Sequence, residues 1–195
     1  GSLLVGHQTT GTLDAATYNS GVGLTSLDAI TSGDYNTAVG YSSLTDNTTG
    51  TYNTAHGSQS LFKNTTASGN TATGYRSLWS NTTGATNTAT GYLSLLANNE
   101  GTGNTATGDL SLWSNTTASY NTANGHRSMM SNTTGTGNDA SGYRSLWSNT
   151  TAHYNTAHGY NALFDANRTA DTDGYNTALG YNAGNTGTND ITTGN

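Results

Sequence analysis

The feature that most constrains the fold of this chain is a repeat of 17 residues. A unit this short cannot hold a helical hairpin or a propeller blade. Each unit is therefore expected to form one turn, or coil, of a β-solenoid that stacks on its neighbours. One asparagine opens each copy, at Asn19, Asn36, Asn53, Asn70, Asn87, Asn104, Asn121, Asn138 and Asn155.

The ninth position of the repeat carries the large apolar residues. Composition alone would permit a polar chain that never folds, because only 31% of the residues are hydrophobic. A fixed register argues against that alternative, since stacked coils would align these residues about 4.8 Å apart and bury a narrow core. The column consists of Leu27, Leu44, Leu61, Leu78, Leu95, Leu112, Met129, Leu146 and Leu163.

The predicted fold is all-β, a parallel β-solenoid (β-roll) of about eleven coils in a single domain, 1–195. We divide it into an irregular first coil 1–18, regular repeats 19–154, an insertion-bearing coil 155–175 and a terminal coil 176–195. The chain has no initial Met and begins in mid-repeat, so we expect a processed product or an excised segment.

Residues 70–86 serve as the reference coil. Alanine recurs at the third position and glycine at the fifth, whereas the fourth position varies. Alternation along a strand then predicts that Ala and Gly point inward and the fourth residue outward. Ser77 to Trp79 are expected to form a second extended wall, and residues 81–84 a turn. Stacked asparagines at the first and twelfth positions are expected to form amide ladders.

The tenth position is the candidate subunit interface. Because Leu78 and Trp79 are adjacent in the predicted second wall, they should point to opposite faces, with the leucine inside. An outward apolar stripe of this length is typical of an interface, and we expect a homotrimer whose three stripes meet on an axis. The alternative is a bent wall that turns both columns inward. The stripe comprises Phe62, Trp79, Leu96, Trp113, Met130, Trp147 and Phe164.

A second regularity has twice the period of the repeat. Trp79, Trp113 and Trp147 occupy the tenth position in alternate coils, and ten residues before each stands Gly69, Gly103 or Gly137. Intervening coils carry a smaller apolar residue at the tenth position and a bulkier residue at the seventeenth. Because packed surfaces conserve volume, we predict that the seventeenth position of one coil touches the tenth of the next, directly or across a subunit interface.

Three strings carry a resemblance to known proteins: residues 36–41 (NTAVGY), 104–108 (NTATG) and 176–183 (NTALGYNA). They resemble the head repeats of YadA-type trimeric adhesins, and more closely the repeats of phage tail-fibre-like proteins that often end in a self-cleaving chaperone domain. The resemblance implies a trimeric β-roll fibre on a cell or virion surface. The adhesin repeat is shorter than 17 residues, so coil shape is not carried over.

Charge and residue pattern argue against several function classes. The net charge is -6, with one lysine and four arginines, so we expect no nucleic-acid partner, and no apolar stretch is long enough for membrane insertion. The acidic residues form no column on adjoining coils, so we expect no enzyme and no catalytic residues. His153 and His158 lack an obvious carboxylate partner and are expected to be solvated.

Two sequence features suggest ligands or modification. The spacing between Asn155 and Asn176 grows to 21 residues, and Asp171 and Asp173 in the insertion are a weak candidate calcium site, the alternative being a plain bulging loop. No other cofactor is expected. The Asn-Thr-Thr turns also create glycosylation sequons, although the same residues are good turn formers. Six candidates share one column: Asn47, Asn64, Asn81, Asn115, Asn132 and Asn149, and Asn167 is a further one.

These observations predict a structural shaft or head of an extracellular fibre or filament that self-associates, with attachment to a cell-surface glycan or protein receptor as a further expected role. Open strand edges also favour head-to-tail polymerisation. The alternative is ice binding by an outward Thr-x-Thr face at residues 71–73, 88–90 and 105–107, which His56, Asn124, Ser141 and His158 interrupt.

Overall fold

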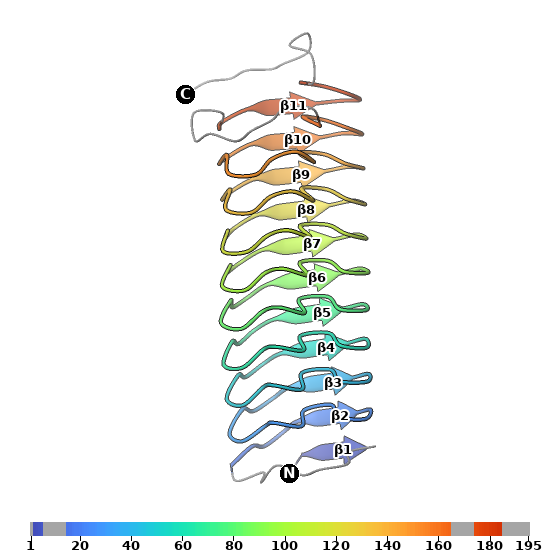
Figure 1. Ribbon diagram of the computed structural model, residues 1–195, viewed down its shortest axis with the longest axis vertical. Helices are drawn as coiled ribbons and strands as arrows, with labels where there is room; N and C mark the ends of the chain where they lie inside the picture. Colours follow the sequence, from blue (N-terminus) through green and yellow to red (C-terminus); the bar gives the residue numbers. More distant parts are fainter. Residues whose placement is uncertain (1, 6–14, 165–173, 185–195) are drawn as a thin grey trace.

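The computed structural model describes residues 2–5, 15–164 and 174–184, and it confirms the β-solenoid. Figure 1 shows one short arrow per coil, stacked along the long axis of the molecule, and no helix occurs in the described ranges. The eleven strands form one sheet in chain order. They are β1 (Leu3–Val5), β2 (Ser20–Val22), β3 (Thr37–Val39), β4 (Thr54–His56), β5 (Thr71–Thr73), β6 (Thr88–Thr90), β7 (Thr105–Thr107), β8 (Thr122–Asn124), β9 (Asp139–Ser141), β10 (Thr156–His158) and β11 (Thr177–Leu179).

All neighbouring strands pair in parallel and in the register of the repeat. Ala72 of β5 lies opposite Ala89 of β6, one repeat further along. The 21-residue spacing leaves this register intact, because Ala157 of β10 lies opposite Ala178 of β11. The same side chains therefore stack from β10 to β11.

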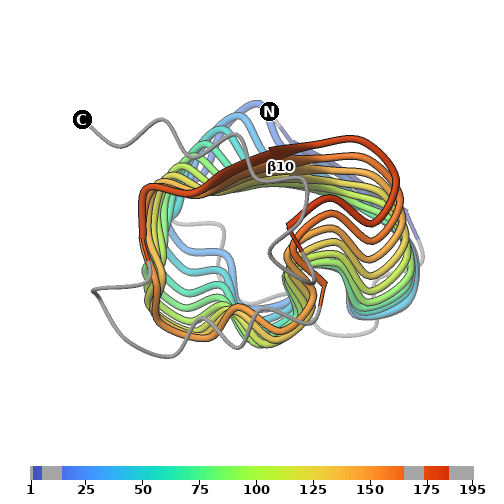
Figure 2. The same ribbon diagram turned by 90° about the horizontal axis from the view of Figure 1, so that it is seen from above.

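The core is a set of stacked columns inside the coil. The ninth-position residues from Leu27 to Leu163 are fully buried, and so are the third-position alanines from Ala38 to Ala178. The view along the axis in Figure 2 shows how closely the coils superimpose. Alternate strand residues point outward, as the exposed-buried-exposed pattern of β6 shows. The sequence prediction is confirmed for these two columns.

The predicted second extended wall is wrong. Each fully described coil has one strand, and residues 75–80 form consecutive turns instead. Arg76 and Leu78 adopt left-handed backbone angles, with φ of 52° and 51°. Their N–H groups bond in opposite axial directions, from Arg76 to the Ser58 carbonyl of the preceding coil and from Leu78 to the Ser94 carbonyl of the next. Hydrogen bonds to both neighbouring coils therefore hold this wall in a series of turns, and it does not form a strand.

The fifth-position glycines have a different role from the one predicted. Gly74 is only half-buried, so it does not face the core as the alanines do. Its φ is +128°, and a Cβ placed on it would lie 2.5 Å from the Gly91 carbonyl oxygen of the next coil. L side chains rarely adopt this conformation. Glycine is required here by backbone geometry and by close stacking.

Both predicted asparagine ladders are present. At the first position, Asn87 Nδ2 donates to the Gly101 carbonyl at 2.8 Å, and its Oδ1 accepts from the Asn104 backbone N–H at 2.9 Å. At the twelfth position, Asn81 Nδ2 donates to Asn64 Oδ1 at 3.0 Å and to the Gly84 carbonyl at 2.9 Å. These amides link successive coils and close the turn within each coil.

Candidate functional site

The predicted interface stripe lies on the outside of the coil, next to the buried leucine column. Its seven side chains, Phe62, Trp79, Leu96, Trp113, Met130, Trp147 and Phe164, are all half-buried. The rings of Phe62 and Trp79 stack with centroids 6.0 Å apart, and those of Trp147 and Phe164 stack at 5.2 Å. The stripe is thus neither fully outward nor turned into the core. Its contact with another subunit stays a prediction.

Cationic side chains flank the stripe. Lys63 Nζ lies 4.2 Å from the centroid of the Trp79 ring, and the Arg76 guanidinium carbon lies 5.8 Å from it. Arg76 Nε also donates to Gln59 Oε1 at 2.6 Å. Further along, the Arg144 guanidinium carbon lies 5.7 Å from the Phe164 ring. These positions favour a surface that buries apolar rings while its rim stays charged.

A second aromatic column runs along the seventeenth position. Tyr18, Tyr35 and Tyr52 stack with centroids 4.9 and 5.1 Å apart, and each is exposed. A Cβ built on Gly69 would have its nearest neighbours in Thr86, the seventeenth residue of the next coil. The described contacts of this column are thus with itself, and its predicted contact with the tenth position stays a prediction.

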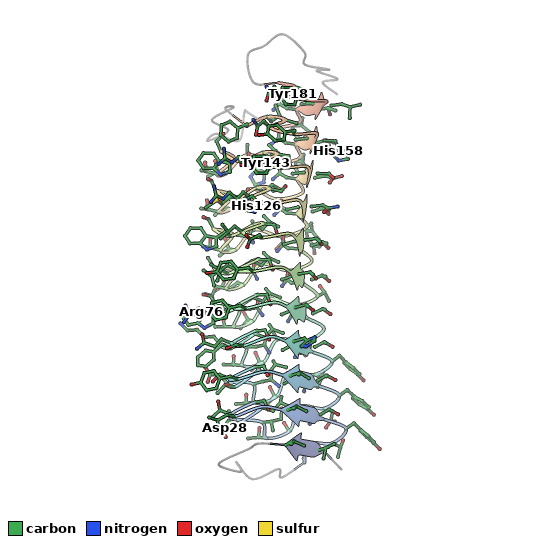
Figure 3. All side chains as sticks on the ribbon, turned by 90° about the vertical axis from the view of Figure 1, so that its right-hand side faces the viewer. Asp28, Arg76, His126, Tyr143, His158 and Tyr181 are labelled. Carbon is green, nitrogen blue, oxygen red and sulfur yellow. The ribbon has the colours of Figure 1, made fainter. Side chains whose placement is uncertain are left out.

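Sequence reasoning missed a third column at the sixth position. Tyr75 and Tyr92 stack at 5.6 Å, and a longer ladder joins His126, Tyr143, Tyr160 and Tyr181 at 5.6, 4.9 and 5.3 Å. Figure 3 shows Arg76, His126 and Tyr143 on the side of the solenoid away from His158, which lies on the sheet. The recurrence of Tyr after the fifth-position Gly is the signal that identifies this column.

The outer face of the sheet carries the Thr-x-Thr array. Thr88 and Thr90 of β6 are exposed, and so are Thr105 and Thr107 of β7. In-register pairing places Thr88 beside Thr105 and Thr90 beside Thr107. The array therefore has the regular spacing of a parallel sheet, about 4.8 Å between strands.

The histidines have more partners than the sequence suggests. His158 was expected to be solvated, but its Nε2 lies 3.2 Å from Asp139 Oδ2 on the neighbouring strand. His126 Nδ1 lies 3.5 Å from Asp109 Oδ2 of the preceding coil. His153 Nδ1 accepts the Thr136 backbone N–H at 2.9 Å. The pairing of His158 is a correction that follows from the diagonal offset of Asp139 and His158 across adjacent strands.

The candidate glycosylation sites are inaccessible in the folded chain. Asn47, Asn64, Asn81, Asn115, Asn132 and Asn149 are all fully buried. Each Nδ2, the atom that would carry a glycan, donates to a carbonyl three residues ahead, as Asn115 does to Ala118 at 3.0 Å. The geometry supports turn formation as the role of this column. Asn167 lies outside the described residues.

No metal or membrane site emerges from the described part of the chain. The candidate calcium ligands Asp171 and Asp173 lie outside it. Within it, no three His, Cys, Asp or Glu side chains come together as a metal site would require. The same residues contain no helix of the length and hydropathy needed to cross a membrane.

Comparison with known proteins found no relative of this chain. No family model, no curated protein and no solved structure matches it.

Proposed function

We propose that this chain is a structural segment, a shaft or head, of an extracellular fibre or filament that forms by self-association. The observation that carries the proposal is the in-register stack of eleven strands, with the same columns continued from coil to coil. Ten inter-strand steps correspond to a rod about 48 Å long. A repeated surface suits extension and lateral contact better than it suits a single reaction centre.

Self-association is the chemistry we assign to the stripe from Phe62 to Phe164. A row of apolar side chains on the outside of a polar chain is typical of an interface. We propose a homotrimer, which can extend by head-to-tail contact of the strand edges at β1 and β11. The exposed tyrosines of the sixth-position column are the surface we assign to attachment, with a cell-surface glycan or protein as receptor.

Sedimentation velocity on the purified chain tests this proposal, because it reports mass and shape together. We expect an elongated particle of three times the 20.0 kDa chain mass, or a longer polymer. The variant Trp113→Ser should shift the particle toward monomer, whereas Thr117→Ser, on the exposed turn of the same coil, should leave it unchanged. A compact monomer at all concentrations would refute the fibre proposal.

Ice binding is the second candidate, favoured by the exposed threonines of β6 and β7. Their hydroxyl and methyl groups form a regular array on a sheet whose strands stay in register. Thermal hysteresis of the purified protein tests it, with Thr90→Lys as the disrupting variant and Thr83→Lys on the turn as the control. Absence of both thermal hysteresis and ice shaping would exclude this function.

A further inference from the structure

The tenth-position and seventeenth-position columns alternate in size with opposite phase. A residue at the seventeenth position and the one ten places later form a rung pair. At three rungs glycine is paired with tryptophan: Gly69/Trp79, Gly103/Trp113 and Gly137/Trp147. At the rungs between and beside them the pairs are Tyr52/Phe62, Thr86/Leu96, Tyr120/Met130 and Tyr154/Phe164. The largest tenth-position residue, tryptophan, thus always accompanies glycine, whereas phenylalanine, leucine and methionine accompany tyrosine or threonine.

Packing within each column does not require this alternation. Tyr18, Tyr35 and Tyr52 occupy the seventeenth position in three consecutive coils and stack without a gap. In the other column, Phe62 and Trp79 are consecutive and also stack. Either column therefore accepts bulky residues on adjacent coils, and glycine is not needed as a spacer.

Contacts along the seventeenth-position column explain part of the alternation. A Cβ on Gly103 would lie 2.9 Å from the Tyr120 ring, and a Cβ on Gly137 would lie 2.8 Å from the Tyr154 ring, so each tyrosine packs over the glycine of the preceding coil. The Trp79 ring contacts Phe62, Lys63 and Arg76. The tyrosines therefore favour glycine at two of the three rungs, but they do not account for tryptophan at the tenth position of the same rungs.

Inheritance from a duplicated two-coil unit would give other positions the same period. The sixth position reads Tyr75, Tyr92, Asp109, His126, Tyr143 in successive coils, with no alternation. The seventh position does not alternate either, and reads Arg76, Leu93, Leu110, Arg127, Arg144. The two-coil period is thus absent from these two positions, although the fifteenth position shares it as Gly101, Ala118, Gly135 and Ala152.

We propose that the tenth-position column of one copy packs against the seventeenth-position column of a second copy, with each tryptophan seated over a glycine. This inference rests on the self-association proposed above and specifies its contact. Two surfaces that pack densely must be complementary in shape, and these two columns pair the largest side chain with glycine at all three tryptophan rungs. The contact is heterologous, so three copies close into a ring if the rotation between them is 120°.

The alternation would also fix the axial register between copies. A slip of one coil, about 4.8 Å, would place tryptophan against tyrosine or threonine instead of glycine. A slip of two coils would place only two of the three tryptophans over glycine. The apolar part of the contact ends near the first coils, where Asp28 and Thr45 occupy the tenth position. The size alternation of the two columns would therefore determine the axial register between copies. We call this alternation the register key.

A bump-and-hole pair at one rung tests the contact. Gly69→Tyr introduces the residue found at Tyr52, whose φ of 58° is close to the 72° of Gly69, and the nearest neighbour of its Cβ is Thr86 Cγ2 at 3.4 Å. The coil should therefore fold, while the new ring clashes with Trp79 of the second copy. We expect the dissociation constant of the oligomer, measured by sedimentation equilibrium, to rise about tenfold or more.

Adding Trp79→Leu to Gly69→Tyr should restore association to within about threefold of the wild-type chain, since the rung then resembles Tyr120/Met130. Thr83→Tyr adds the same ring on an exposed turn and should leave the dissociation constant unchanged. Circular dichroism and thermal melting verify that each variant is folded. Association of Gly69→Tyr at wild-type strength, or no recovery in the double variant, would overturn the proposed contact.

Disulfide trapping provides an independent test, because the chain contains no cysteine. A chain with both Thr86→Cys and Leu96→Cys should form covalent oligomers on oxidation, whereas each single variant should not. Cross-linking of Leu96→Cys with itself would instead place the stripes against one another and overturn the heterologous contact, while leaving the fibre proposal standing. A wild-type chain that is monomeric throughout would refute both.

Discussion

At the scale of single residues, buried amides carry much of the connection between coils. Asn87 is fully buried, and its Nδ2 and Oδ1 bond to the Gly101 carbonyl and the Asn104 N–H. Leaving such groups buried without partners costs more than the net gain of one hydrogen bond. The first-position ladder is therefore a sensitive point of the fold.

Replacing Asn87 with alanine should destabilise the chain by about 3 kcal/mol, because two buried backbone groups lose their partners. Urea unfolding followed by circular dichroism measures the change. The matched control is Thr83→Ala on the exposed turn, which should stay within about 0.5 kcal/mol of wild type. Equal losses for the two variants would contradict the role assigned to the ladder.

Gly74→Ala should be more damaging than Gly69→Ala. The first places a Cβ 2.5 Å from the Gly91 carbonyl oxygen at φ +128°, whereas the second meets only Thr86 at 3.4 Å, in a conformation that Tyr52 also adopts. We expect a loss of about 3 kcal/mol or more for Gly74→Ala and about 1 kcal/mol for Gly69→Ala. The difference in urea midpoint between the two variants measures this, and a similar midpoint for both would show that the fifth position tolerates a side chain.

Asp46 gives the chain a specific pH dependence. Desolvation raises the pKa of its carboxyl above the ordinary value, and the nearby Lys63 ammonium opposes the shift. The folded chain then binds this proton more tightly than the unfolded chain, so ionisation of Asp46 lowers stability as pH rises through the raised pKa. Asp46→Asn should therefore be more stable than wild type at pH 7, with the advantage shrinking toward pH 3. Melting curves at both pH values check the sign, and a constant or growing advantage at low pH would contradict it.

At the scale of elements, the repeat made one strand and one turn per coil predictable. The alternation of Ala72 with Thr71 and Thr73 and the Asn-Thr-Thr-Gly string after Ser80 are local signals with direct structural counterparts. The wall between them was not predictable, because Arg and Leu ordinarily avoid the left-handed region that Arg76 and Leu78 occupy. Hydrogen bonds to the coils before and after impose that conformation, and no local sequence signal encodes it.

The candidate surfaces were predictable only in part. The stripe around Trp79 is at the surface as expected, but its half-buried state depends on the turned wall. The contact between His158 and Asp139 joins different positions on adjacent strands, so a search along single columns misses it. The 17-residue spacing supplies the strand register, but a diagonal contact also depends on the direction of the two side chains, which the spacing does not supply.

Deleting whole coils tests the two-coil period directly. Removal of residues 87–120 takes out two coils and keeps the alternation in phase, whereas removal of 87–103 takes out one coil and reverses the phase beyond the junction. Each deletion variant is mixed with the full-length chain and refolded. The two-coil deletion should form mixed oligomers with the full-length chain, and the fraction of the one-coil deletion found in mixed oligomers should be at least about tenfold lower. Native mass spectrometry counts the mixed species. Equal incorporation of both deletions would refute the register key.

At the scale of the whole molecule, the scarcity of charge sets the response to solvent. Only 8% of the residues are charged, and the described ion pairs involve partly exposed histidines. Stability therefore depends mainly on stacked apolar and amide columns, which salt screens little. We expect the melting temperature to change by less than about 3 °C between about 0.05 and 1 M sodium chloride. A larger drop in high salt would indicate that the cations near the stripe contribute more than the columns.

The asparagine ladders have a consequence for the evolution of length. Asn87 donates two hydrogen bonds to Asn70 Oδ1 of the preceding coil and presents its own Oδ1 to Asn104 of the next, so successive coils are joined by the same hydrogen bonds. A gene that gains or loses repeats changes the height of the product in steps of about 4.8 Å per coil without redesigning any joint. Recombination between repeats can thus change the length of the solenoid while every contact between neighbouring coils stays the same.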